Sequence, residues 1–183
     1  MTSASRGRPQ ASSRETLADA ACELFLEQGY EATSIADITR RAGVSRSTFF
    51  NYFDGKAGAI WYALDERLAS TDFAGRDALR ELARGLGEHP PHTLALAIVN
   101  AEIMGLGEEL ETGRALRQFS LARSLAPGSE SGRVGGGAMA IRAEIAAAAG
   151  AAAVFAAIWR WAVLGAGTHR LDELIDETLE LTA

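Results

Sequence analysis

Apolar residues recur at intervals of three and four along the chain, which is the spacing of one face of a helix. The first such segment starts at a capping box formed by Ser12 and Glu15, and Gly29 follows its last turn, near Gln28. Its apolar stripe consists of Leu17, Ala21, Leu24 and Phe25. The pattern therefore predicts a first helix over residues 12–28.

Two shorter helices joined by a glycine turn are predicted next. Ser34 and Asp37 repeat the capping pattern at the start of one helix, Gly43 ends it, and Ser45 caps the other. Their apolar positions are Ile35, Ile38, Ala42, Val44, Phe49 and Phe53. Two short amphipathic helices around such a turn form a helix-turn-helix, whose second helix can lie in a DNA major groove. The segment favours a sequence-specific DNA-binding transcriptional regulator.

The rest of the chain also has helical periodicity and shows no strand-like alternation. A fourth helix is predicted to start at Asp54 and Gly55, with Lys56 in its first turn. The further predicted helices cover residues 79–86, 94–106, 116–125, 138–164 and 171–179, and a glycine-rich loop or hinge covers 127–137. The segment 138–164 is either one helix or two helices broken near Gly150.

These elements predict an all-α protein. We expect a basic, disordered arm at 1–11, a three-helix DNA-binding domain with the helix-turn-helix at 12–55, and a helical ligand-binding and dimerisation bundle at 56–183. With 183 residues and 48% apolar content, the chain can form a packed interior. The one cysteine, Cys22, excludes an internal disulfide and a cysteine-rich zinc site, and is expected to fill the core.

The formal net charge of −6 lies entirely outside the predicted DNA-binding part. Residues 1–56 carry seven basic and seven acidic groups, whereas residues 57–183 carry eleven basic and seventeen acidic groups. Phosphate affinity must therefore come from a local patch. The charge-free run 145–159 has only fifteen residues, mostly alanine, against about 20 for a membrane span. We expect burial between helices, no membrane association and a cytoplasmic location.

The run from Arg14 to Lys56 resembles the TetR family of bacterial regulators. The residues that carry the resemblance are Leu24, Phe25, Gly29, Tyr30, Thr33, Ser34, Ile35, Ile38, Ala42, Gly43, Val44, Ser45, Thr48, Phe49, Phe50, Asn51, Tyr52, Phe53 and Lys56. The resemblance implies a homodimer, joined through its last two helices, whose two heads bind successive major grooves of a palindromic operator in double-stranded DNA. The positions that it places on DNA are Ser34, Ala36, Arg46, Ser47, Thr48, Phe50, Tyr52 and Lys56.

The chemistry of these side chains suggests their roles. Hydroxyls at Ser34, Thr48 and Tyr52, with the Lys56 ammonium, suit phosphates, whereas Arg46 and Ser47 suit base edges, Arg46 being the first candidate for guanine. Phe50 has two interpretations, an apolar contact with DNA or packing under the next helix. Thr39 stands where the family usually has alanine, and Phe50 where tyrosine is common.

Two weaker patterns leave alternatives open. The residues from Arg6 to Pro9 resemble the core of an AT-hook, and equally suit a basic tail that attracts DNA nonspecifically. His89 and His92 flank two prolines, but without neighbouring carboxylate or thiolate partners they do not make a metal site. The sequence shows no motif for catalysis or for a cofactor, so we expect neither an enzyme nor a bound cofactor.

The C-terminal half is expected to enclose an apolar effector pocket, for which the candidates are Asn100, Met104, Phe119 and Trp159. Trp159 and Trp161 point in different directions on a helix, so one suits the pocket and the other the subunit contact. The leading hypothesis is a repressor that a small apolar ligand releases from its operator. A regulator that activates transcription instead is the alternative within this hypothesis. The competing hypothesis is a helical ligand-binding or protein-interaction module without a DNA-binding role.

Overall fold

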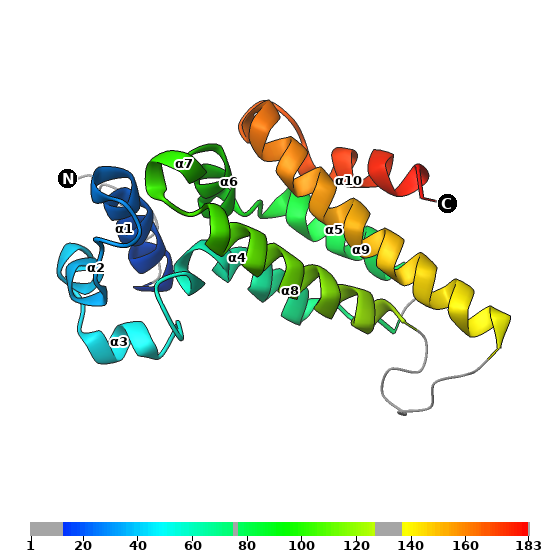
Figure 1. Cartoon of the computed structure of the whole chain (residues 1–183), viewed down its shortest axis with the longest axis horizontal. Helices are drawn as coiled ribbons and strands as arrows, with labels where there is room; N and C mark the ends of the chain where they lie inside the picture. The colour runs from blue at the N-terminus through cyan, green and yellow to red at the C-terminus, as the bar shows by residue number, and fades with distance from the viewer. Residues whose placement is uncertain (1–12, 75–76, 127–136, 183) are drawn as a thin grey trace, which may run out of the picture.

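The computed structural model describes residues 13–74, 77–126 and 137–182, and all regular elements in these ranges are helices. They are α1 (Ser13–Gln28), α2 (Ile35–Ala42), α3 (Arg46–Phe50), α4 (Gly58–Ser70), α5 (Ala78–Glu88), α6 (His92–Val99), α7 (Ala101–Met104), α8 (Gly107–Leu125), α9 (Ala138–Gly165) and α10 (Leu171–Glu180). Helices α1 to α3 form one end of the molecule, and α8 and α9 run side by side along the rest (Figure 1). The predicted all-α fold is confirmed for the described residues.

Several predictions concern residues outside the described ranges. These are the basic arm at 1–11, with its AT-hook-like sequence, the Ser12 cap of the first helix, and the loop at 127–136. The predicted end of the first helix is confirmed, because α1 ends at Gln28 and Gly29 follows with a positive φ of 84°. A positive φ suits glycine, which has no Cβ to clash with the carbonyl.

The predicted start of the fourth helix is wrong, because α4 begins at Gly58. Residues 55–57 form a tight turn instead, in which the amides of Gly58, Ala59 and Ile60 each donate to a carbonyl three residues earlier. Lys56 therefore precedes the helix and does not lie in its first turn. The boundary between the two predicted domains falls within this turn and stays a prediction.

The predicted helix over 94–106 is also wrong, because it divides into α6 and α7 at Asn100. The Asn100 side chain donates to the Leu96 carbonyl at 2.8 Å, so it serves the last turn of α6. Gly105, with φ 67°, then ends α7 in the left-handed conformation. Local side-chain capping here outweighs the continuous apolar periodicity from which one helix was predicted.

Helix α9 is a single helix of 28 residues, which decides between the two alternatives for this segment. It continues through Gly150, where an added Cβ would lie 2.9 Å from Leu79 Cδ1. The glycine thus permits a close helix contact and does not break the helix. By length and composition α9 could cross a membrane, although its charge-free run has only fifteen residues. It packs against α6, α8 and α10, as a core helix does.

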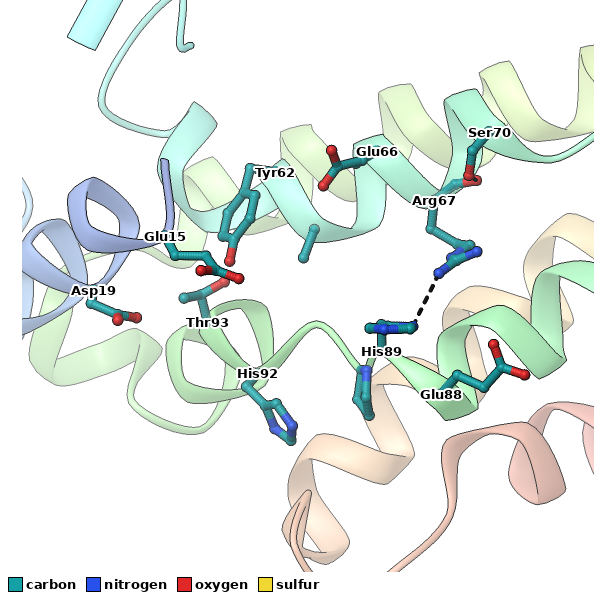
Figure 2. A pocket seen from close by; sticks show the side chains of 12 residues that line it. Glu15, Asp19, Tyr62, Glu66, Arg67, Ser70, Glu88, His89, His92 and Thr93 are labelled. Atoms are coloured by element: carbon teal, nitrogen blue, oxygen red, sulfur yellow. Dashed lines mark hydrogen bonds between the residues drawn. The ribbon is translucent and has the colours of Figure 1, made fainter. Parts of the chain in front are cut away.

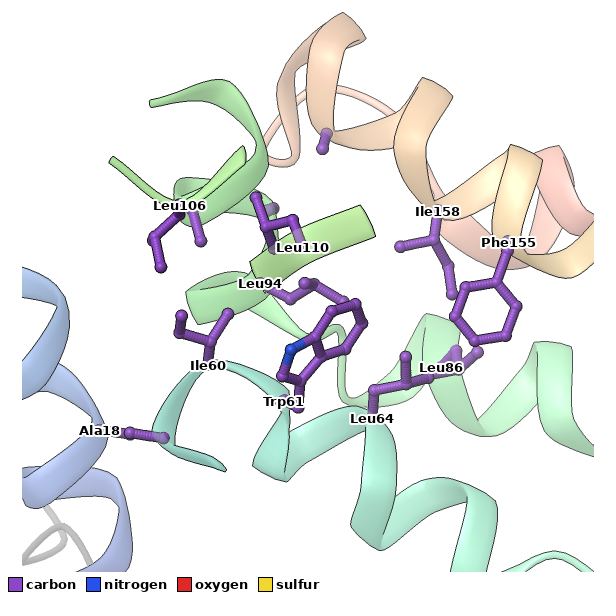
Figure 3. Close-up of a cluster of buried hydrophobic side chains, with 14 of the residues drawn as sticks. Ala18, Ile60, Trp61, Leu64, Leu86, Leu94, Leu106, Leu110, Phe155 and Ile158 are labelled. Carbon is purple, nitrogen blue, oxygen red and sulfur yellow. The ribbon is translucent and has the colours of Figure 1, made fainter. Parts of the chain in front are cut away.

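The buried apolar side chains form one cluster that joins the N-terminal helices to the others. Figure 3 shows the part of it around Trp61, between α4, α8 and α9. Cys22 belongs to the interior as predicted, since it is 2% exposed and burial raises the pKa of its thiol to about 12. The head and the remaining helices therefore share a continuous hydrophobic core.

Gly113 is expected to be essential for the packing of α8 on Trp61. An added Cβ would lie 2.6 Å from Trp61 Cζ2, and the indole is only 1% exposed, so it has no free space to move into. We expect Gly113→Ala to lower the free energy of unfolding by about 1–3 kcal/mol, as overpacking usually does. Thermal or denaturant unfolding measures this. Gly107→Ala, in the same helix with open space around its Cα, is the control, and equal stability of the two variants would contradict the prediction.

Candidate nucleic-acid interface

Helices α2 and α3 are set by the local caps that the sequence predicts. The Ser34 hydroxyl accepts from the Asp37 amide at 3.2 Å, and the Ser34 amide donates to Asp37 Oδ2 at 3.1 Å, which completes the capping box. Gly43 ends α2 with φ 69°. The Ser45 hydroxyl accepts from the Thr48 amide at 3.1 Å and so caps α3. The helix-turn-helix is confirmed down to its caps.

The inner face of the helix-turn-helix is buried. Ile38 and Phe49 are fully buried and Phe53 is 4% exposed, and the two phenyl rings meet edge to face at 5.3 Å between centroids. Thr39 is also buried, and its hydroxyl donates to the Ala36 carbonyl at 3.2 Å. The extra hydroxyl at this position is therefore satisfied within the helix and does not disturb the packing.

The outer face carries the residues that the sequence assigns to DNA. Phe50 is 50% and Tyr52 42% exposed, and Ser34, Ala36, Arg46 and Ser47 are exposed as well, whereas Thr48 and Lys56 are partly buried. The half-exposed ring of Phe50 contacts Phe49 edge to face and does not pack under α4. Of the two interpretations of Phe50, this favours the apolar contact with DNA. An exposed phenyl ring on this helix can meet thymine methyls and sugar edges.

Arg46 differs from the other cations of the head. Arg41 pairs with Glu27 at 2.6 Å and with Glu23 at 3.1 Å, which ties α2 to α1. Arg40 pairs with Asp37, and Arg14 pairs with Glu66 of α4. Within residues 13–57, Arg46 is the arginine for which no ion pair is found, and it is exposed at the start of α3. Its guanidinium is available to an external anion or base edge.

Three hydroxyls assigned to DNA already have partners in the free protein. The Ser34 hydroxyl donates to Asp37 Oδ2 at 2.5 Å, so its hydrogen is used within the cap. The hydroxyls of Ser47 and Thr48 lie 2.7 and 2.8 Å from that of Ser45. Sequence reasoning missed these bonds, although the residue types at the caps indicate them. Donation by Ser34 to a phosphate therefore requires exchange of its bond to Asp37. Ser45 has one hydroxyl hydrogen, so at least one of Ser47 and Thr48 donates to Ser45 and must exchange that bond in order to donate to DNA.

Lys56 also has internal partners. Its ammonium donates to the Tyr30 carbonyl at 2.6 Å and to the Thr33 carbonyl at 3.2 Å, and it lies 4.0 Å from the centroid of the Tyr30 ring. An ammonium has three hydrogens, so one remains for a phosphate. The Tyr30 amide in turn donates to the Met104 carbonyl at 2.7 Å. Lys56 thus holds the α1–α2 turn, and that turn is bonded to the end of α7.

The four candidate pocket residues do not come together. Met104 is fully buried in the core, Asn100 caps α6, and Phe119 is 65% exposed on α8. Trp159 packs against Trp61 at 6.1 Å between ring centroids, and the Arg114 guanidinium lies 4.7 Å from the centroid of the Trp159 ring. Gly113 lets α8 lie against Trp61, since an added Cβ would be 2.6 Å from Trp61 Cζ2. Trp161 is buried, and its indole N–H donates to the His169 carbonyl at 2.9 Å.

Two cavities lie elsewhere. One, of about 600 Å³, is between α1, α4 and the α5–α6 connection, and the other, of about 490 Å³, is a groove along α8 that includes Phe119. His89 and His92 line the first, and His89 Nδ1 is 3.4 Å from Arg67 Nη2. No group of three or more metal-ligating side chains is found in the part of the chain that the structure describes.

The capping box gives a prediction about pH. Hydrogen bonds from the Ser34 hydroxyl, the Arg40 guanidinium and the Ser34 amide lower the pKa of Asp37 from 3.8 to about 2. A lowered pKa means that the carboxylate stabilises the fold above pH 3.8 and that this stabilisation is lost as the pH falls through about 2. We expect Asp37→Asn to unfold at a lower temperature than the wild type at neutral pH, and this difference to narrow towards pH 2.

Thermal unfolding followed across this pH range tests the prediction. Asp54→Asn is the matched control, because Asp54 is an exposed carboxylate of the same head without an ion pair in the described structure. An Asp37→Asn variant as stable as Asp54→Asn at neutral pH would contradict the role assigned to the capping box.

The chain was compared with known proteins. Residues 17–58 match the family model described as bacterial regulatory proteins, tetR family. The HTH-type transcriptional repressor ComR of Escherichia coli (strain K12) is 41% identical over 61 residues, which are 33% of this chain and 29% of that protein. The putative mycofactocin biosynthesis transcriptional regulator MftR of Mycobacterium tuberculosis (strain ATCC 25618 / H37Rv) is 35% identical over 63 residues, 34% of this chain and 32% of that one. The chain thus matches about a third of the length of these curated relatives.

Solved structures resemble the whole fold. The dihydroxyacetone kinase operon activator DhaS aligns over 93% of each chain with a TM-score of 0.53 and 18% identity. The fatty acid degradation regulator FadR from Bacillus halodurans aligns over 96% of each chain with a TM-score of 0.52 and 18% identity. At such identities the likeness concerns the fold alone. Residues 17–58 thus match the tetR family of bacterial regulatory proteins, and the arrangement of the helices over the whole chain resembles that of solved regulators.

Proposed function

We propose that the chain is a sequence-specific DNA-binding transcriptional regulator, which acts in the cytoplasm as a repressor released from its operator by a small molecule. The observation that carries this proposal is the outer face of α3. Arg46 is exposed there beside the exposed Phe50 and has no ion pair among the described residues, whereas the opposite face of the same helix is buried. A helix buried on one side and equipped with a free guanidinium on the other suits the major groove.

The distribution of charge supports a local contact with DNA. The chain as a whole carries −6, and the internal ion pairs of Arg14, Arg40 and Arg41 leave little free positive charge in the head. Nonspecific attraction by the described residues is therefore weak, and base contacts must contribute much of the affinity. This argues against a head that binds any nucleic acid equally, and favours a single class of operator sequence.

Dimerisation is proposed through α8 and α9. The apolar side chains exposed on these helices are Leu116, Phe119, Met139, Ile141, Ile145 and Val163, each more than half exposed. The 490 Å³ groove along α8 lies beside them, lined by Phe119, Ala122 and Ala148 among others. On a lone chain these side chains would be exposed to water, and a second copy related by a two-fold axis would cover them.

The outer face of α10 does not fit the contact that the family resemblance implies for the last two helices. Its exposed residues include Glu173, Asp176, Glu177 and Glu180. A two-fold contact would bring these carboxylates close to their own copies, and like charges repel. We therefore assign the contact to α8 and α9, with α10 at its margin.

Release from DNA is proposed to follow from the spacing of the two heads. Recognition helices that bind successive grooves of B-DNA must lie about 34 Å apart. An effector that binds better to a conformer with another spacing lowers operator affinity, and a useful shift needs a difference of about 2–5 kcal/mol between the two conformers. Whether the regulator represses or activates depends on where the operator lies relative to the promoter.

Selection of bound fragments from the source genome tests the proposed function. The full chain is mixed with sheared genomic DNA, and the retained fragments are sequenced and bound again singly. We expect a small set of fragments that share a palindromic element and bind at least about a thousandfold more tightly than random DNA of equal length. Retention of all fragments alike, or of none, would favour the competing hypothesis of a helical module without a DNA-binding role.

Lys56→Met is expected to weaken binding to all DNA sequences by a similar factor. The third hydrogen of the ammonium is proposed to hold a phosphate, and a phosphate contact carries no sequence information. The slope of log affinity against log salt should fall by about one ion. Binding titrations at several salt concentrations measure it, with the folded state of the variant verified first, since the bonds to Tyr30 and Thr33 are lost as well. An unchanged salt slope would restrict Lys56 to its internal role.

A further inference from the structure

The larger cavity lies where the head meets the other helices. Figure 2 shows it between α1, α4 and the connection from α5 to α6, and its volume is about 600 Å³. It is lined by Glu15, Asp19, Tyr62, Ala63, Glu66, Arg67, Ser70, Glu88, His89, Pro90, His92 and Thr93. A cavity of this size holds a small organic molecule.

Carboxylates stand at both ends of this cavity. Asp19 lies on α1 at one end and Glu88 at the end of α5 at the other (Figure 2). Neither has an ion-pair partner among the residues that the structure describes. Glu66, between them, pairs with Arg14 at 3.2 Å, and Arg67 turns to His89. The cavity therefore presents two exposed carboxylates without ion pairs in the described structure, at opposite ends, and the Arg67 guanidinium beside His89.

Asp19 lies among other carboxylates. Burial, together with the nearby Glu23 and Glu15, raises the pKa of Asp19. Burial also raises the pKa of the Tyr62 phenol, as do the charges of Glu15, Asp19 and Glu66. Burial is the larger cause of both shifts, and the neighbouring carboxylates add to it, so a positive charge in the cavity would offset the smaller, electrostatic part.

The lining of the cavity also includes apolar surface. Ala63, Pro90 and the partly buried ring of Tyr62 contribute it. An aromatic ring and aliphatic side chains suit methylene groups, and a ring face also attracts cations. We propose that this cavity binds a linear aliphatic diamine or polyamine, with one ammonium at Asp19, another at Glu88, and the methylene chain along Tyr62.

The position of the site connects it to DNA binding, and this part rests on the proposed function. Arg14 of α1 joins the head to α4 by its pair with Glu66, and its guanidinium lies 5.5 Å from the centroid of the Tyr62 ring and 5.9 Å from that of Phe53. A diamine held at Asp19 of α1 and at Glu88 of α5 bridges the head and the other helices at this junction. Bound diamine therefore favours one position of the head relative to the other helices and lowers affinity for the operator.

Calorimetric titration of the full chain tests the site without any DNA. The probes are diaminoalkanes with three to eight methylenes, and for each one the monoamine of equal length. We expect saturable binding of one diamine per chain at one preferred length, and at least about tenfold weaker binding of the monoamine, which loses one charged contact. Equal affinity of diamine and monoamine, or no saturable binding of any diamine, would overturn the proposal.

Variants locate the binding. Asp19→Asn and Glu88→Gln should each weaken the preferred diamine by about tenfold. Glu177→Gln removes an exposed carboxylate of α10, outside the cavity, and should leave the affinity unchanged. The same loss in all three variants would reveal nonspecific attraction to an acidic protein and would overturn the site.

The effect on DNA is measured with the selected genomic fragments. Saturating diamine should weaken their binding to the wild type and not to Glu88→Gln. Unchanged operator binding at saturation would overturn the regulatory role. A chain that binds no fragment would contradict the proposed function. The calorimetric titration would still show whether the cavity binds a diamine, because it needs no DNA.

Discussion

Replacing Arg46 by alanine is expected to weaken binding to the operator by about 5- to 150-fold, and to abolish the preference for guanine at one position of each half-site. The range corresponds to the 1–3 kcal/mol that a good bidentate contact with a base contributes to discrimination. No other basic side chain of the described head is both exposed and free of ion pairs, so no neighbour can replace its contact. Titration of the operator and of all single-base variants measures the effect.

Arg80→Ala is the matched control for this experiment. Arg80 is an exposed arginine of α5 whose partner is Asp77, and its loss changes the net charge equally. Its effect on operator binding should be small and independent of sequence. If Arg46→Ala weakens all operator variants by one common factor, Arg46 holds a phosphate and the assignment to guanine is wrong.

A charge at the proposed subunit contact is expected to separate the dimer. Ile145 is 63% exposed on α9, among the apolar residues of the α8–α9 face. An unpaired arginine there would be buried twice in a symmetric dimer, and each buried unpaired charge costs about 3–5 kcal/mol. We expect Ile145→Arg to raise the dimer dissociation constant by at least about a hundredfold and to remove operator binding at concentrations where the wild type is saturated.

Leu181→Arg distinguishes the two candidate contacts. Leu181 is 86% exposed at the end of α10, so the variant should remain dimeric if α8 and α9 form the contact. Analytical ultracentrifugation of both variants over a range of concentrations gives the comparison. A monomeric Leu181→Arg protein beside a dimeric Ile145→Arg protein would return the contact to the last two helices.

The sequence predicts most accurately the features that depend on neighbouring residues. The caps of α2 and α3 follow from Ser34, Asp37 and Ser45, because a capping side chain needs only the amides two or three residues away. The burial of Phe49 and Phe53 follows from their spacing on one turn. The same local chemistry explains why α6 and α7 are separate helices, because the Asn100 side chain donates to the Leu96 carbonyl in the last turn of α6. The apolar periodicity alone did not predict this break.

Contacts between distant segments were not predictable in this way. The ammonium of Lys56 reaches the Tyr30 and Thr33 carbonyls across more than 20 residues, and Arg41 reaches Glu27 across 14. The positions of the candidate pocket residues depend on such contacts as well, and the effector pocket stays a prediction. Only the packing of α8 against α4 shows that Gly113 admits the indole of Trp61 and that aromatic side chains fill the interior. The cavity at the junction of α1 and α4 likewise combines residues from three separate segments.

The central claim is that α3 of each subunit lies in a major groove and that two subunits read adjacent grooves. Protection of guanine N7 from methylation by dimethyl sulfate, measured on a selected operator, tests it most directly, since N7 lies in the major groove. We predict two groups of protected guanines on one face of the duplex, about 10 base pairs apart, with the protection lost in Arg46→Ala. Undiminished methylation of every guanine at saturating protein would contradict the account.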